Sequence, residues 1–173
     1  MGKIESEISV VCDAGPAIHL DELGCIDLLK DFQKVLLPST VWGEINRHRP
    51  SVLKNEGVSF VQLSGKTPSS EPLLTLCKIF SLDAGEIEAL VIMEQRPQAL
   101  FLTDDAAARL VAKQMGFKVH GTIGILIRSI RQEQKSPSEV LDILKNIPSN
   151  TSLYIKHSLL QDIQLKIKSE FNL

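Results

Sequence analysis

Hydrophobic residues recur along the chain as short runs, separated by longer stretches in which apolar and polar positions alternate with helical spacing. The runs are rich in β-branched residues, which predicts strands at 8–12, 34–37, 58–63, 99–102 and 117–119. Helical segments are predicted at 16–23, 26–32, 39–47, 73–80, 85–95 and 105–115, then from Gly121 onward, at 138–146 and at 152–170. Strands that alternate with helices in this way favour a parallel sheet covered on both faces, an α/β/α sandwich.

Composition is consistent with one globular domain. The chain has 173 residues, 43% of them hydrophobic and 23% charged, which is enough for one sizeable core. We expect the domain to occupy residues 1–150 and a closing helix within 151–173 to pack on it.

The charge and the cysteine content indicate which partners and which cellular environment to expect. The formal net charge of −2 argues against a broadly basic nucleic-acid-binding surface. The three cysteines have no spacing typical of zinc sites or disulfide frameworks, so a reducing, cytoplasmic environment is expected. No apolar run reaches the roughly 18 residues that a membrane span needs, and no membrane association is expected.

Isolated acids stand where strands end and helices begin. Asp13 directly follows the first predicted strand, and Asp104 and Asp105 follow the fourth. The carboxyl ends of parallel strands are where ligand sites gather, so these acids should lie together. Glu44 borders the apolar face of its helix, and Glu86 opens the most apolar helix. Clustered carboxylates are costly unless a cation neutralises them, and oxygen-only ligands favour Mg²⁺ or Mn²⁺.

Each acid also has an ordinary structural interpretation. Asp13 is placed to cap the helix that begins near Pro16, and Glu44 could be a solvated flank residue. Asp83 and Glu86 have the spacing of a capping box. One residue of the pair Asp104 and Asp105 should be an N-cap and the other free, with Asp104 favoured for the site because it directly extends the strand. Glu88 could face the site in place of Glu86.

Together these acids follow the order seen in a known family. The segments that carry the resemblance are Cys12-Asp13-Ala14-Gly15-Pro16, Thr40-Val41-Trp42-Gly43-Glu44, Leu82-Asp83-Ala84-Gly85-Glu86, Thr103-Asp104-Asp105 and Gly121-Thr122-Ile123-Gly124. In this order the chain resembles the PIN-domain family of metal-dependent ribonucleases, in particular the branch of predicted nucleic-acid-binding proteins related to toxins of toxin–antitoxin pairs.

The resemblance implies a three-layer sandwich whose parallel sheet has the strand order 3-2-1-4-5. It implies Mg²⁺ or Mn²⁺, RNA as substrate, a homodimer and, for a toxin, an antitoxin protein as partner. Carried over by position, the catalytic and metal-binding acids would be Asp13, Glu44, Glu86 and Asp104. Thr103, Asp105 and Glu88 would lie beside these acids and orient them.

One departure concerns the residue after the first aspartate. The family usually has Ser or Thr there, whereas this chain has Ala14 followed by Gly15. Thr103 could supply the missing hydroxyl from the neighbouring strand. The departure supports an alternative function, a non-catalytic PIN-fold module that binds nucleic acid or protein through a weakened metal site.

The remaining expectations concern contacts outside the acids. RNA would need cations, and the candidates near the acids are Arg47, Arg49, Arg109 and Lys113. His19 is expected on the surface or on a helix face, because no partner triad is evident in the sequence. A homodimer is further expected because the segment at 26–32 and the closing helix carry more apolar residues than one small domain readily buries.

Overall fold

The computed structural model describes residues 8–65 and 70–173. Its centre is a five-stranded sheet in which every strand pair is parallel and the order is β3-β2-β1-β4-β5. The strands are β1 (Val10–Cys12), β2 (Val35–Pro38), β3 (Phe60–Leu63), β4 (Leu100–Leu102) and β5 (Lys118–His120). The predicted sheet and its strand order are confirmed.

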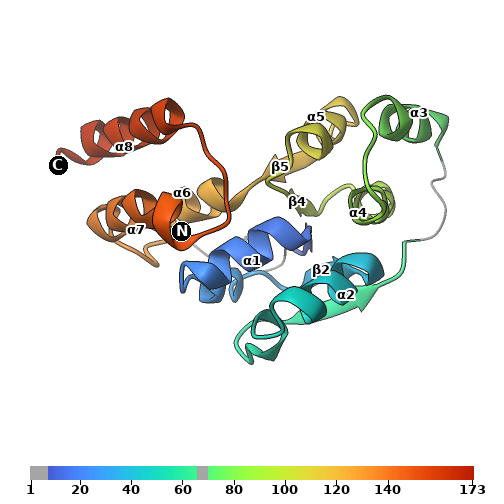
Figure 1. Ribbon diagram of the computed structural model, residues 1–173, viewed down its shortest axis with the longest axis horizontal. Helices are drawn as coiled ribbons and strands as arrows, with labels where there is room; N and C mark the ends of the chain where they lie inside the picture. The colour runs from blue at the N-terminus through green and yellow to red at the C-terminus, as the bar shows by residue number, and fades with distance from the viewer. Residues whose placement is uncertain (1–7, 66–69) are drawn as a thin grey trace.

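Helices cover both faces of the sheet, as Figure 1 shows, with α3, α4 and α5 on one side and α1, α6 and α7 on the other. Their bounds are α1 (Ala14–Glu22), α2 (Ser39–His48), α3 (Glu71–Ile79), α4 (Ala84–Gln95), α5 (Ala106–Gln114), α6 (Thr122–Arg131), α7 (Pro137–Asn150) and α8 (His157–Phe171). Two short 3₁₀ helices, η2 (Ile26–Leu29) and η3 (Val52–Lys54), complete the described elements.

Side chains of the central strands point alternately into two hydrophobic clusters, because successive residues of a strand face opposite sides. Val10 and Cys12 of β1 pack with α1, α6 and α7, whereas Val11 packs with α3, α4 and α5. All three β1 residues are fully buried. The strand is therefore covered on both faces, as its continuous apolar sequence predicted.

The C-terminal region differs from the predicted boundaries. Helix α7 continues to Asn150 with Pro148 in its last turn, and α8 begins only at His157. The intervening residues are held by hydrogen bonds instead of helix, since the Ser152 amide and hydroxyl both donate to the Glu22 carboxylate of α1. Helix α8 then packs on α7, with Leu160 and Ile167 buried.

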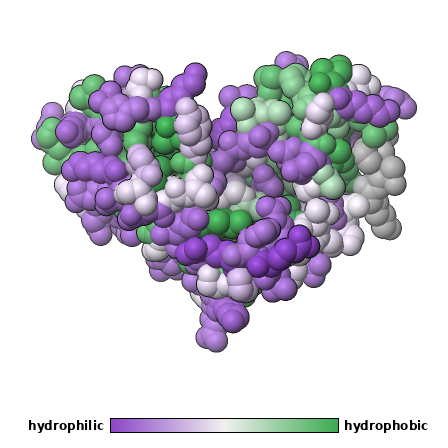
Figure 2. All heavy atoms as spheres, in the orientation of Figure 1, coloured by the Kyte–Doolittle hydropathy of each residue, from purple (hydrophilic) through white to green (hydrophobic). Residues whose placement is uncertain are grey.

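Most of the apolar residues on which the expected dimer rested are buried within the chain. Ile26, Leu28 and Leu29 of η2 belong to the first core cluster. On the C-terminal segment the exposed apolar side chains are Tyr154 (85% exposed), Leu165 (63%), Leu173 (58%), Leu159 (51%) and Phe171 (38%). Figure 2 shows such apolar residues scattered on a mainly hydrophilic surface. Within residues 8–65 and 70–173, no helix has the length and hydrophobicity to cross a bilayer.

Candidate active site at the carboxyl edge of the sheet

Asp13 and the pair Asp104 and Asp105 lie at the ends of neighbouring strands. Cys12 of β1 pairs with Leu102 of β4, and the amide of Asp13 donates to the Leu102 carbonyl at 2.9 Å. The first and last acids of the predicted site therefore meet at one edge of the sheet.

Asp13 is both a helix cap and a buried carboxylate. Its Oδ1 accepts the Ala14 amide at 2.8 Å, and its Oδ2 accepts the Thr103 hydroxyl at 3.1 Å. Burial raises the pKa of Asp13 from 3.8 to about 6, against the effect of these two hydrogen bonds and with a further rise from Asp83 and Glu44. Thr103, which is fully buried, thus supplies the hydroxyl that Ala14 lacks.

Glu86 lies in the same group of carboxylates. It forms the predicted capping box, because its Oε2 accepts the Asp83 amide at 2.9 Å while its own amide donates to Asp83 Oδ1 at 2.9 Å. Burial raises the pKa of Glu86 from 4.5 to about 7, and the charges of Asp105, Asp83 and Asp13 add to the rise. The Glu86 side chain therefore both caps α4 and interacts electrostatically with the other acids.

Glu88 serves a different purpose. Its two oxygens accept the amides of Thr40 at 2.9 Å and Gly65 at 3.0 Å, which ties α4 to the start of α2 and to the segment after β3. Burial would raise the pKa of Glu88, but these hydrogen bonds outweigh it and lower the pKa. Of the two glutamates, Glu86 is the one that faces the other acids.

Asp104 turns toward α1 and α6. Its Oδ1 accepts the Thr122 amide at 2.8 Å, and its Oδ2 accepts the Thr122 hydroxyl at 2.6 Å and His19 Nδ1 at 2.8 Å. Burial would raise the pKa of Asp104, but the hydrogen bonds from His19 and Thr122 lower it. A Cβ atom on Gly121 would overlap Asp104 Oδ1 and lie 2.5 Å from Nη2 of Arg109, so this close approach requires glycine.

Asp105 caps α5 through Oδ1, which accepts the Ala108 amide at 2.8 Å, and it is exposed. Its charge helps to raise the pKa of Glu86. The acids at this edge thus fall into two groups. Asp13 and Glu86 are the two whose pKa values are raised by neighbouring carboxylates, and with those neighbours they form what we call the acidic cluster: Asp13, Glu44, Asp83, Glu86 and Asp105. Asp104 instead forms a hydrogen-bonded network with His19 and Thr122.

A model of the family described as PIN domain matches residues 9–169. The chain belongs to the PIN-domain family. None of the curated proteins matches it. A PIN domain has a nuclease-like fold and typically uses divalent metal ions, so the acidic cluster of this PIN domain is its candidate active site.

The cations suggested for RNA binding lie in different surroundings in this PIN domain. Arg49 pairs with Asp21, and Arg109 donates from Nη2 to the Thr103 carbonyl at 2.9 Å. Both therefore have structural partners. Arg47 and Lys113 are exposed.

Three residues at the site were missed or misjudged from sequence. His19 lies on a helix, as one of the two expected placements had it, but its side chain is only 12% exposed and contacts Asp104, a partner that was not expected. Thr122 was part of a matching segment but had no assigned role, and Asp83 was considered only as a cap. A signal for His19 was available, because it lies on the helix that Asp13 caps.

Proposed function

We propose that this PIN domain hydrolyses RNA phosphodiester bonds with the help of Mg²⁺ or Mn²⁺. The observation that supports the proposal is the acidic cluster, in which burial and neighbouring carboxylates raise the pKa values of Asp13 to about 6 and of Glu86 to about 7. Asp13 and Glu86, which are partly buried and repelled by neighbouring carboxylates, are costly to keep ionised, and a bound divalent cation would relieve that cost.

The chemistry of the donor set fits such an ion. Carboxylate oxygens without sulfur or imidazole are the ligands that Mg²⁺ and Mn²⁺ prefer. We assign the ligand role to Asp13, Glu44 and Asp105, and place Glu86 beside them as a proton acceptor. When bound, the ion would polarise the phosphate and lower the pKa of a coordinated water.

Sequence analysis favoured Asp104 over Asp105 as a ligand, and the contacts of Asp104 argue for a supporting role instead. Both of its oxygens already accept hydrogen bonds from His19 and Thr122. Asp104 would then hold α1, through His19 in its last turn, and the start of α6 in place, next to Asp13 and Asp105. Asp105 keeps one oxygen outside its helix cap.

The residues of the chain prepare the site in two ways. Thr103 donates its hydroxyl proton to Asp13 and fixes that carboxylate. Glu86, with a pKa of about 7, is suited to take a proton from an attacking water near neutral pH. Its Oε2 is oriented by the Asp83 amide.

A non-catalytic PIN module is the second candidate function. Among the described residues, no three His, Cys, Asp or Glu side chains are already arranged to hold a metal ion. Activity therefore requires side chains of the acidic cluster to move toward the ion. A toxin role with an antitoxin partner, a homodimer and a cytoplasmic location would accompany the nuclease function.

The test is cleavage of labelled single-stranded RNA with Mn²⁺, compared with DNA of the same sequence and with an EDTA control. Asp13→Asn and Asp105→Asn should abolish cleavage, whereas Asp162→Asn, at an exposed position on α8, should cleave as the wild type does. Asp104→Asn should lower activity less than Asp105→Asn. Cleavage that persists in EDTA or in Asp13→Asn would mean a contaminating enzyme, and no metal binding by the wild type would favour the non-catalytic module.

A further inference from the structure

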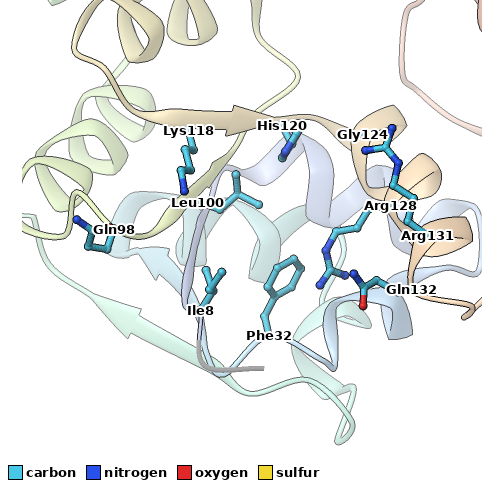
Figure 3. Close-up of a pocket in the computed structure, with 10 residues that line it drawn as sticks. All are labelled: Ile8, Phe32, Gln98, Leu100, Lys118, His120, Gly124, Arg128, Arg131 and Gln132. Carbon is cyan, nitrogen blue, oxygen red and sulfur yellow. The ribbon is translucent and has the colours of Figure 1, made fainter. Parts of the chain in front are cut away.

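A pocket of about 230 Å³ lies between β5 and α6, apart from the acidic cluster. Figure 3 shows Lys118 and His120 reaching into it from β5, with Arg128 and Arg131 on α6 across from them. Phe32 and Leu100 form an apolar part of the wall.

Regular secondary structure explains why the cations meet here. Lys118 and His120 are two residues apart on a strand and therefore point to the same face. Gly124, Arg128 and Arg131 are spaced by four and three residues and therefore share one face of α6. Gly124 leaves room for the histidine, since a Cβ there would lie 3.1 Å from His120 Nδ1.

The pocket is positively charged in a protein whose formal net charge is −2. None of the lining residues within 8–65 and 70–173 is acidic. Arg128 pairs with Asp31 at 2.8 Å and stacks over the Phe32 ring at 4.5 Å, which fixes it as part of the wall. Burial, together with Arg109, Arg128 and Arg131, lowers the pKa of His120, as expected in a cationic surrounding.

We propose that this pocket binds a phosphate monoester, either on a free mononucleotide or at the 5′ end of an RNA strand. Apart from Arg128, which already pairs with Asp31, Lys118 and Arg131 give the described lining residues a surplus of two positive charges. That surplus matches the charge of a phosphate monoester, about −1.5 to −2 at neutral pH. Arginine and lysine are also the usual partners of phosphate oxygens.

The size and polarity of the pocket agree with this ligand. Its volume of about 230 Å³ is below the roughly 300–1,000 Å³ of pockets that hold drug-sized ligands. A phosphate with part of its nucleoside suits that space better than a large cofactor. Leu100 offers an apolar contact, and the side-chain amide of Gln98 can hydrogen-bond to a sugar or base.

Most of the pocket lies toward the amino edge of the sheet, where Leu100 and Lys118 begin β4 and β5, and His120 connects it to the carboxyl edge. The His120 carbonyl accepts the Thr103 amide at 2.9 Å, and Thr103 in turn contacts Asp13. The proposal that an RNA 5′ end binds here rests on the proposed function, whereas the proposal that a free nucleotide binds here does not.

Binding can be measured by calorimetry and fluorescence anisotropy in EDTA, so that cleavage plays no part. The probes are AMP, adenosine, and one short RNA with either a 5′ phosphate or a 5′ hydroxyl. The double variant Lys118→Ala/Arg131→Ala removes two charges from the pocket. The control Lys78→Ala/Lys166→Ala removes two exposed charges from α3 and α8.

We expect the pocket variant to bind the phosphorylated probe at least about tenfold more weakly, since each lost charged hydrogen bond typically costs that much. The control should bind as the wild type does. Preference for AMP over adenosine identifies the free nucleotide as a ligand, and preference for the 5′-phosphorylated RNA identifies the strand end. No preference in either pair, or equal binding by the pocket variant, overturns the proposal.

A second measurement does not depend on variants of the pocket. Titration of the wild type with AMP should shift the ring resonances of His120 and leave those of the exposed His157 unchanged. Asp13→Asn should give the same shifts, which separates failure of the pocket from failure of the nuclease function. Unchanged His120 resonances at saturating AMP and RNA would refute the site.

Discussion

Replacing Asp13 by Asn should make the metal-free protein more stable at neutral pH. The carboxyl pKa of Asp13 is raised from 3.8 to about 6, chiefly by burial. The folded state therefore holds the Asp13 proton more tightly than the unfolded state does. The stabilisation from the protonated form is complete below about pH 3.8 and is lost as the pH rises through about 6.

At pH 7.5 this loss amounts to about 3 kcal/mol, at about 1.4 kcal/mol for each pH unit between the two pKa values. Asparagine avoids the loss and keeps both contacts: its Oδ1 can accept the Ala14 amide, and its Nδ2 can donate to the Thr103 hydroxyl. The pKa of about 6 already includes what these two hydrogen bonds contribute to the ionised carboxylate. The net gain should therefore approach about 3 kcal/mol, or roughly 6–12 °C in Tm for a chain of this length.

The assay is chemical and thermal denaturation in EDTA at pH 4.5 and 7.5, with Asp162→Asn as an exposed control. The difference between Asp13→Asn and the wild type should be largest at pH 7.5 and shrink to about a third at pH 4.5. Adding Mn²⁺ should stabilise the wild type more than the variant. A variant that is less stable at pH 7.5, or a difference that does not change with pH, would refute the reasoning.

Three further predictions concern neighbouring features. Gly121→Ala should destabilise the fold by about 1–3 kcal/mol in urea denaturation, because its Cβ would overlap the fixed carboxylate of Asp104; unchanged stability would contradict the described packing. Glu88→Gln should cost about 1 kcal/mol at pH 7, and this difference should vanish on acidification through the lowered pKa of Glu88, because the stability that this glutamate adds is present only while it is ionised. Leu165→Asp should convert a homodimer to a monomer in sedimentation if the exposed apolar residues of α8 form the interface; a wild type that sediments as a monomer at micromolar concentration would end the dimer proposal.

The sheet and the meeting of Asp13 with the Asp104 and Asp105 pair could be predicted, because both follow from local patterns. Apolar runs mark the strands, and strand ends of a parallel sheet share one edge. The choice between Asp104 and Asp105 could not be made. The side chains of adjacent residues point in different directions. Asp104 accepts hydrogen bonds from Thr122, which lies 18 residues later in the chain.

Contacts between distant segments explain two other places where the structure differs from the predictions made from sequence. His19 was expected at the surface or on a helix face because its helix shows no partner for it, and the partner comes from the end of β4. Similarly, residues 151–156 have a composition compatible with helix, but Ser152 bonds to Glu22 near the other end of the chain. Local propensity carries no information about such pairs.

The hydroxyl of Thr103 has a consequence for how rigid the acidic cluster is. This hydroxyl accepts the Asp105 amide at 3.1 Å, and an amide can only donate, so its single proton is committed to Asp13. The chain of bonds thus runs in one direction, from the backbone of Asp105 through Thr103 to the Asp13 carboxylate. The orientation of Asp13 is set before any ligand arrives, and a ligand meets this acid in a fixed position relative to the start of α5.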